Sequence, residues 1–147
     1  MAFDPGGTTG VAAFNSSGEI LWMNTVPGEE VTDLLDDTDL TNCEVFIVEE
    51  YRIYPNKFQK HIYSSVETLQ YIGAIKNWAR KKNIKVVEQK ANVKSSAYKW
   101  MATRPRPKSD PLNHALDAMV HGVFYLVKKK VIKPEDLPAA KNQMKDF

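Results

Sequence analysis

The chain opens with a short apolar strand, an aspartate and a Gly-rich turn, and these residues constrain its fold more than any other stretch. Met1-Ala2-Phe3 resembles the end of an apolar strand, and Val11-Ala12-Ala13-Phe14 is a second apolar run. Between them lies Asp4-Pro5-Gly6-Gly7-Thr8-Thr9-Gly10, whose glycines permit tight turns and close backbone approaches. This pattern predicts a hairpin with a carboxylate at its mouth, where a metal ion or a phosphate can come close. A plain turn capped by an aspartate is the simpler interpretation of these residues alone.

Apolar periodicity predicts three antiparallel strands, followed by helices that alternate with further strands. Strands are expected over 1–3, 11–14, 20–25, 44–50 and 84–88, and helices begin near 27, 64, 93 and 111. Four consecutive apolar residues over 45–48 are typical of a strand buried on both faces. We therefore expect an α/β fold with a mixed five-stranded sheet flanked by helices, in the outline of ribonuclease H-like proteins. One nuclease-like domain over 1–130 and a tail over 131–147 account for the chain.

Composition narrows the environment and the partner. No apolar run approaches a membrane span, no signal peptide is visible, and the single cysteine, Cys43, suits a reducing cytosol. Residues 1–50 hold eleven acidic residues and no basic ones, whereas residues 51–147 hold all 20 basic residues. The net charge of +2 therefore conceals a basic half, which favours a polyanionic partner such as nucleic acid. We expect a cytoplasmic protein of a bacterial cell or of a phage-infected host.

Carboxylates from distant segments are candidates for one metal site. Asp4 ends the first strand, and Glu49 and Glu50 end the fourth. Asp110, His114, Asp117 and His121 fall within a narrow arc of a helix at about 100° per residue. If the helix packs across the ends of the two strands, oxygen donors that suit Mg²⁺ or Mn²⁺ meet there. A pair of such ions activates water for phosphodiester cleavage.

These residues resemble the motifs of RuvC-type Holliday junction resolvases. The resemblance extends over most of 1–127 and rests on Asp4-Pro5-Gly6 with Thr9-Gly10, on Ile47-Val48-Glu49, on the Gly-containing helix 64–82 and on His114-Ala115-Leu116-Asp117-Ala118. It implies that Asp4, Glu49, His114 and Asp117 are catalytic and bind two divalent ions. It also implies a homodimer that resolves four-way DNA junctions by paired hydrolysis of two strands. Many members have an aspartate where this chain has His114, and the softer, neutral imidazole tilts the expected metal preference toward Mn²⁺.

The less favoured candidates have ordinary structural interpretations. Asp110 before Pro111 is a typical helix cap. Strand alternation turns Glu50 away from the side of Glu49. His121 is expected to support the site or to lie in the core.

Basic and aromatic residues flank the predicted site and are candidate DNA contacts. The loop after Glu50 combines aromatic faces with cations, and the stretch 90–109 contains basic residues and no acid. The expected contacts are Tyr51, Arg52, Tyr54, Lys57, Lys60, Lys94, Lys99, Arg104, Arg106 and Lys108. Apolar residues of the helix over 64–82, among them Tyr71, Ile72, Ile75 and Trp78, exceed what one sheet face covers and are candidates for a dimer face.

Three other functions remain open at this stage. A ribonuclease H-like nuclease acting on flaps, branched DNA, RNA–DNA hybrids or tRNA-like structures would use the same site. A non-catalytic nucleic-acid-binding protein on this fold would bind without metal-dependent cleavage. A sugar-kinase-like ATP-binding module also uses Asp-x-Gly-x-Thr turns, although the chain is short for its two-lobed forms.

Overall fold

A twisted five-stranded sheet forms the centre of the computed structural model, which describes residues 1–52, 62–102 and 109–137. Its order is β3-β2-β1-β4-β5, so the shortest strand, β1, lies in the middle. Pairing is antiparallel for β1 with β2 and for β2 with β3, and parallel for β1 with β4 and for β4 with β5. The strands are β1 Ala2–Asp4, β2 Thr8–Phe14, β3 Ile20–Pro27, β4 Val45–Glu50 and β5 Lys85–Lys90. The predicted mixed sheet is confirmed.

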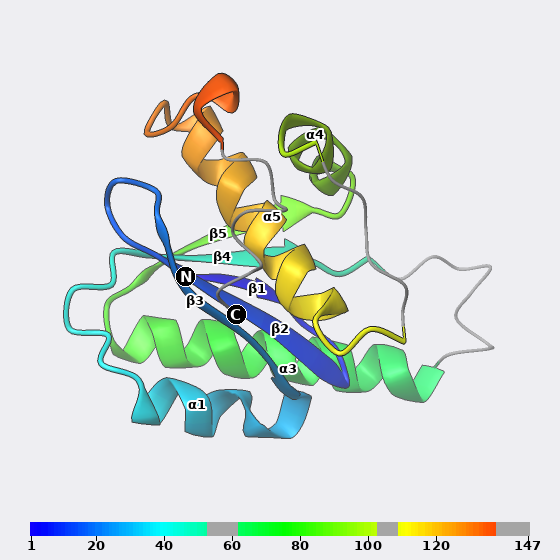
Figure 1. Cartoon of the computed structure of the whole chain (residues 1–147). Helices are drawn as coiled ribbons and strands as arrows, with labels where there is room; N and C mark the ends of the chain where they lie inside the picture. The colour runs from blue at the N-terminus through cyan, green and yellow to red at the C-terminus, as the bar shows by residue number, and fades with distance from the viewer. Residues whose placement is uncertain (53–61, 103–108, 138–147) are drawn as a thin grey trace.

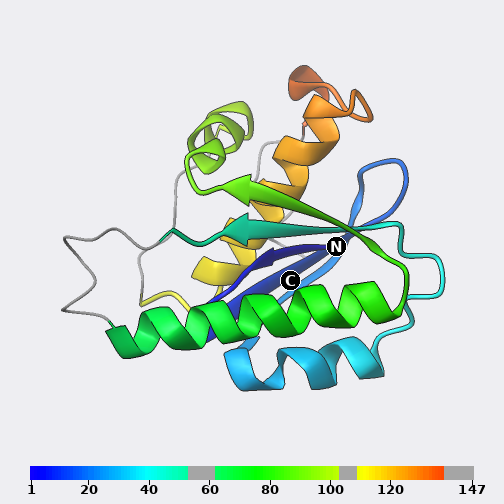
Figure 2. The ribbon, with the colours of Figure 1, turned by 180° about the vertical axis from the view of Figure 1, so that it is seen from behind.

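Helices cover both faces of the sheet (Figure 1). Seen from behind, α3 runs along one face with α1 beside it, and α4 and α5 lie on the other (Figure 2). None of the described helices is long and apolar enough to cross a membrane. The helical elements are η1 Gly28–Glu30, α1 Val31–Asp37, α3 Ile62–Lys81, α4 Val93–Trp100, α5 Asn113–Lys128 and η2 Pro134–Asp136.

Strand alternation separates an apolar face from the face that carries the candidate site. Phe3 of β1 and Phe46 and Val48 of β4 join the core beneath α1 and α3. Successive side chains of a strand point to opposite faces, so Asp4 and Glu49 project toward α5. The same period that builds the core therefore delivers two carboxylates to one side of the sheet.

Small residues allow α5 to lie close to the sheet. Ala2 and Ala12 are fully buried, and a Cβ on Gly10 would overlap the carbonyl of His114 at the start of α5. The amide of Ala115, in the first turn of the helix, donates to Oγ1 of Thr25 at 3.2 Å. Gly10 and Thr25 thus set where the first turn of α5 meets β2 and β3.

Two expectations about the helices need correction. The last helix begins at Asn113 instead of at 111, so Asp110 lies in the turn before it. Three of the α3 residues expected at a dimer face belong to the core instead, because Ile72 and Ile75 are buried and Trp78 packs against the core. The exposed apolar side chains of α3 are Ile62, Tyr63, Val66 and Leu69.

Candidate active site

Three carboxylates from three elements converge on the ammonium group of Lys94. Asp4 comes from the end of β1, Glu49 from the end of β4 and Asp117 from the second turn of α5. The Nζ atom of Lys94 lies 2.7 Å from Oε2 of Glu49, 2.9 Å from Oδ2 of Asp117 and 3.5 Å from Oδ1 of Asp4. The carboxyl ends of β1 and β4 adjoin because the two strands are parallel neighbours. We call Asp4, Glu49, Asp117 and Lys94 the carboxylate cluster.

His114 joins this cluster through Asp4. Its Nδ1 donates to Oδ2 of Asp4 at 2.8 Å, and this hydrogen bond is the main cause that raises the pKa of His114 above its ordinary value. Burial raises the pKa of Asp4, against the hydrogen bond from His114 and the charge of Lys94. The four residues to which the family resemblance assigns catalysis are therefore neighbours in space.

A second histidine supports Glu49 from the interior. His121 is fully buried, with Nε2 2.7 Å from Oε2 of Glu49 and Nδ1 2.9 Å from Oε1 of Gln89. Glu49 and Gln89 are register partners in β4 and β5, so both side chains point to the face that His121 covers. Because an ionised carboxylate only accepts hydrogen bonds, Nε2 of His121 is the donor. This contact agrees with the supporting role expected for His121.

The hydrogen bond and the ammonium group together fix the charge of Glu49. Burial alone would raise the pKa of Glu49, but the hydrogen bond from His121 and the positive charge of Lys94 outweigh it and hold the pKa at about 2. Glu49 therefore stays ionised at neutral pH although its side chain is largely buried.

Sequence reasoning missed three of these partners. Gln89, Tyr98 and the inward position of Lys94 carry no recognisable motif. The hydroxyl of Tyr98 donates to Oδ1 of Asp117, while Lys94 contacts the other oxygen of that carboxylate. Burial and the hydrogen bond to Asp117 raise the pKa of Tyr98 above its ordinary range. The available signal was the spacing of Lys94 and Tyr98, which places both on one face of a short helix.

Glu50 and Asp110 lie apart from the cluster. Glu50 forms an ion pair with Nε of Arg52 at 2.9 Å, which fits the prediction that it turns away from Glu49. Asp110 accepts from the amide of Leu112 at 2.9 Å, just before α5, and so organises the turn that leads into the helix.

The candidate DNA contacts divide between described and undescribed residues. Tyr51 hydrogen-bonds through its hydroxyl to Oγ of Ser65 at 2.7 Å, and Lys99 is exposed on α4. Arg52 pairs with Glu50, and Lys94 is turned into the carboxylate cluster. Tyr54, Lys57, Lys60, Arg104, Arg106 and Lys108 lie outside the described residues.

The cluster has the chemistry of a divalent-metal site but is not arranged as one. Among the described residues, no three His, Cys, Asp or Glu side chains lie close enough together to hold a metal ion as they are placed. A cation nevertheless stands within 3.5 Å of all three carboxylates, namely the ammonium of Lys94. Carboxylate oxygens with one imidazole are donors that Mg²⁺ and Mn²⁺ accept. The donor set therefore fits such an ion, provided that Lys94 moves.

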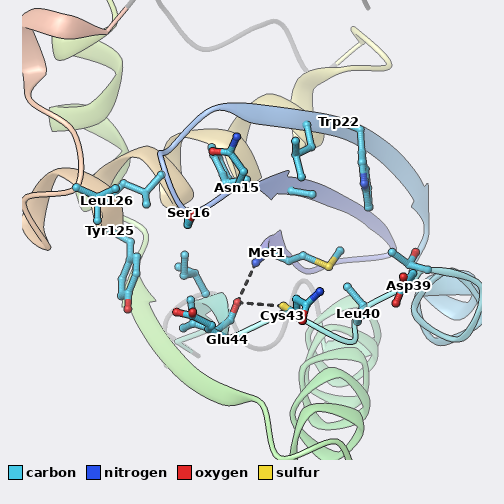
Figure 3. A pocket seen from close by; sticks show the side chains of 18 of the residues that line it. Met1, Asn15, Ser16, Trp22, Asp39, Leu40, Cys43, Glu44, Tyr125 and Leu126 are labelled. Carbon is cyan, nitrogen blue, oxygen red and sulfur yellow. Dashed lines mark hydrogen bonds between the residues drawn. The ribbon is translucent and has the colours of Figure 1, made fainter.

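A cleft of about 820 Å³ lies at the other end of the strands and contains none of these residues (Figure 3). It adjoins the start of β1 and β4 and the end of α5, where the amino group of Met1 donates to the carbonyl of Val45 at 2.8 Å. The carboxylate cluster is thus separate from the cleft.

Comparison with known proteins identifies the fold. No protein-family model and no curated protein matches the sequence. The structure is similar to that of Thermus thermophilus RuvC in complex with a Holliday junction substrate, with a TM-score of 0.54 and 17% sequence identity over 87% of this chain and 94% of that one. A second Thermus thermophilus RuvC structure gives a TM-score of 0.51 at 17% identity, over 87% of this chain and 95% of the other. The fold expected from the sequence motifs, that of a RuvC-type resolvase, is confirmed.

Proposed function

We propose that this protein is a metal-dependent endonuclease that cleaves four-way DNA junctions. The observation that carries the proposal is the convergence of Asp4, Glu49 and Asp117 on one cation position, at the carboxyl ends of two parallel strands in a RuvC-like fold. A structural ion pair needs two charges, whereas three largely buried carboxylates around one point are costly unless cations compensate them. Such an arrangement is typical of sites that handle phosphodiesters through divalent ions.

Asp4, Glu49, Asp117 and His114 would hold the ions, and His121 and Tyr98 would orient two of those carboxylates. When bound, Mg²⁺ or Mn²⁺ ions activate water and stabilise the leaving oxygen of a phosphodiester. The chain itself positions the ligands. Gln89 and His121 fix the rotamer of Glu49 from the interior, and Tyr98 fixes that of Asp117.

We further propose that the active form is a homodimer that pairs through α3. Ile62, Val66 and Leu69 recur at helical spacing on its exposed side, and Tyr63 beside them is 85% exposed. Gly73 lies on the same stripe, and a Cβ there would meet nothing within 4 Å. A stripe of apolar side chains beside a glycine suits close contact with the same helix of a second copy. Two sites related by a two-fold axis would then face the two strands of a junction.

Cleavage assays on defined substrates test the proposal. The protein is incubated with a four-way junction, a flap, a linear duplex and an RNA–DNA hybrid, each with Mg²⁺, Mn²⁺ or EDTA. We expect metal-dependent cleavage of the junction above the other substrates. Preferential cleavage of flaps or hybrids would replace junction resolution with another nuclease activity on the same site, and binding without cleavage would favour a non-catalytic protein.

Adjacent glutamates provide a matched pair of variants. Glu49→Gln should lower the cleavage rate by about a thousandfold or more, because a metal ligand supplies several kcal/mol of transition-state stabilisation. Glu50→Gln removes the same charge one residue away and outside the cluster, so its rate should stay within a few-fold of wild type. Full activity of Glu49→Gln, or of Asp117→Asn, would exclude the proposed site.

A further inference from the structure

The ammonium group of Lys94 lies between the three carboxylates that would hold a metal ion under the proposed function. Lys94 lies in the first turn of α4, and its ammonium group reaches oxygens of Glu49, Asp117 and Asp4 at 2.7, 2.9 and 3.5 Å. The side chain is 19% exposed, so these contacts are largely shielded from water. Three contacts to three elements distinguish it from a surface lysine that pairs with one neighbour.

The ammonium group compensates charges that would otherwise repel one another. Asp4, Glu49 and Asp117 come together because of strand order and the close packing of α5, and no second lysine or arginine is paired with them among the described residues. Burial opposes the charge of Lys94, but the carboxylates of Asp4 and Glu49 raise its pKa above the ordinary lysine value, so that it remains a cation. In the absence of metal, Lys94 therefore keeps the carboxylates assembled.

The same contacts exclude a divalent ion. Oε2 of Glu49 already accepts from both His121 and Lys94, and Oδ2 of Asp117 accepts from Lys94. An ion bound to these oxygens would have to displace the ammonium group. The two cations would otherwise lie in contact on the same oxygens and repel each other. The position of the ammonium group accounts for donors that converge although no group of described His, Cys, Asp or Glu side chains is placed to hold a metal ion.

We propose that Lys94 is the resident counter-ion of the metal-free carboxylate cluster, and that metal binds only when its ammonium group withdraws. Lys94 thus preserves the ligand arrangement at the cost of metal affinity. The inference rests on the proposed function, in that it takes the cluster to be a divalent-metal site. It concerns binding equilibrium, so it can be tested without DNA.

Titration of Mn²⁺ into the metal-free protein, followed by calorimetry and by the EPR signal of free Mn²⁺, measures the competition. If the ammonium group of Lys94 is away from the carboxylates in about a tenth of the molecules, its removal tightens Mn²⁺ binding about tenfold. We therefore expect Lys94→Met, which keeps an unbranched side chain and ends one atom short of the ammonium nitrogen, to bind Mn²⁺ about tenfold more tightly than wild type. The melting temperature of the metal-free variant should fall, and its rise on addition of Mn²⁺ should exceed that of wild type.

Two further variants keep the test decisive. Lys85→Met removes an equal charge at the exposed start of β5, and should bind Mn²⁺ as wild type does. Lys94→Arg retains a cation and should bind Mn²⁺ no more tightly than wild type. This variant can still be measured if Lys94→Met does not fold. Equal or weaker binding by Lys94→Met, or tighter binding by Lys94→Arg, would overturn the inference.

The outcomes also separate this inference from the proposed function. Metal-dependent cleavage by wild type with unchanged Mn²⁺ affinity in Lys94→Met would remove the role of Lys94 and leave the nuclease intact. Absence of Mn²⁺ binding in every variant, together with absence of cleavage, would overturn both.

Discussion

Glu49 illustrates how neighbouring groups determine the charge of a single carboxylate, and through it the stability of the protein in acid. Its pKa of about 2 lies below the ordinary value of 4.5. A depressed pKa in the folded state means that the ionised form contributes stability above about pH 4.5, and that this contribution disappears as the pH falls toward 2. Its loss should destabilise the metal-free protein by about 3 kcal/mol across that interval.

Urea unfolding in EDTA at pH 2 to 7 measures this contribution. Wild type should lose about 3 kcal/mol more of its unfolding free energy between pH 4.5 and 2 than Glu49→Gln, which has no proton to bind at this position. Parallel curves for the two proteins would contradict the hydrogen bond and ion pair assigned to Glu49. The Glu50→Gln variant, whose partner is the exposed Arg52, serves as the control for removal of a nearby acid.

His121 acts on the site only through Glu49, and its replacement tests that role. His121→Ala should weaken Mn²⁺ binding by about 10–100-fold, the usual effect of removing a group that orients a metal ligand. His121→Gln carries an amide N–H that reaches toward Glu49, and should restore most of the affinity. A merely structural role would lower the unfolding free energy of both variants and leave Mn²⁺ affinity unchanged, and calorimetric titration distinguishes the two cases.

The limits of sequence reasoning are clearest at single residues. Asp4, Glu49 and Asp117 could be predicted from the sequence because the motifs around them are short and local. Asp4 and Glu49 each end a strand, and Asp117 lies on one helix face with His114. The position of Lys94 could not be predicted, because a lysine in a basic stretch has the same local sequence pattern whether it faces DNA or a buried carboxylate. The pairing of Gln89 with Glu49 depends on the register of two parallel strands, which the sequence of either strand leaves open.

At the scale of elements, the close contact of α5 with β2 determines whether His114 reaches Asp4. Gly10→Ala places a methyl group on the backbone of His114, so either the helix or the strand must move. Overpacking of this kind costs about 1–3 kcal/mol, and the shift should also weaken Mn²⁺ binding because His114 and Asp117 move with α5. Gly7→Ala is the matched control, since a Cβ on Gly7 meets nothing within 4 Å.

Urea unfolding and Mn²⁺ titration of the two alanine variants provide the measurements. Gly7→Ala should stay within a few tenths of a kcal/mol of wild type, or be slightly more stable through loss of chain entropy in the unfolded state. Equal stability and equal metal affinity in Gly10→Ala would show that α5 is not held by this contact.

The elements themselves were largely predictable, because each has a strong period of its own. The buried run of β4 and the apolar periodicity of α3 identified a strand and a helix near the expected places. The first and last residues of these elements were harder to predict from the sequence. Pro111 is a favourable first residue of a helix, but the turn stabilised by Asp110 extends to Leu112 and delays the start of α5. Tertiary contacts thus decide boundaries that local preference leaves open.

At the scale of the whole molecule, the unequal charge of the two halves of the sequence acquires a structural meaning. Asp4 and Glu49 come from the acidic first 50 residues, and Lys94 comes from the basic remainder. The two halves meet at the carboxylate cluster because β4 lies between β1 and β5 in the sheet. The helix that follows β5, α4, lies on the same face of the sheet as α5 (Figure 2). The cluster is thus assembled by topology from segments up to 113 positions apart, from Asp4 to Asp117.

Association through α3 is the prediction that belongs to the whole molecule. Val66→Glu places a charge within the exposed apolar stripe, where burial against a second copy would leave it unpaired, so the dimer should dissociate at micromolar concentration. Glu67→Gln changes an exposed neighbour that lies off the stripe and should remain dimeric. Sedimentation equilibrium measures both masses, and a dimeric Val66→Glu would exclude α3 as the interface. If cleavage of both junction strands requires two active sites, monomeric Val66→Glu should still bind Mn²⁺ as wild type does. It should lose the coordinated cleavage of both strands, which is measured on a circular DNA that contains the junction.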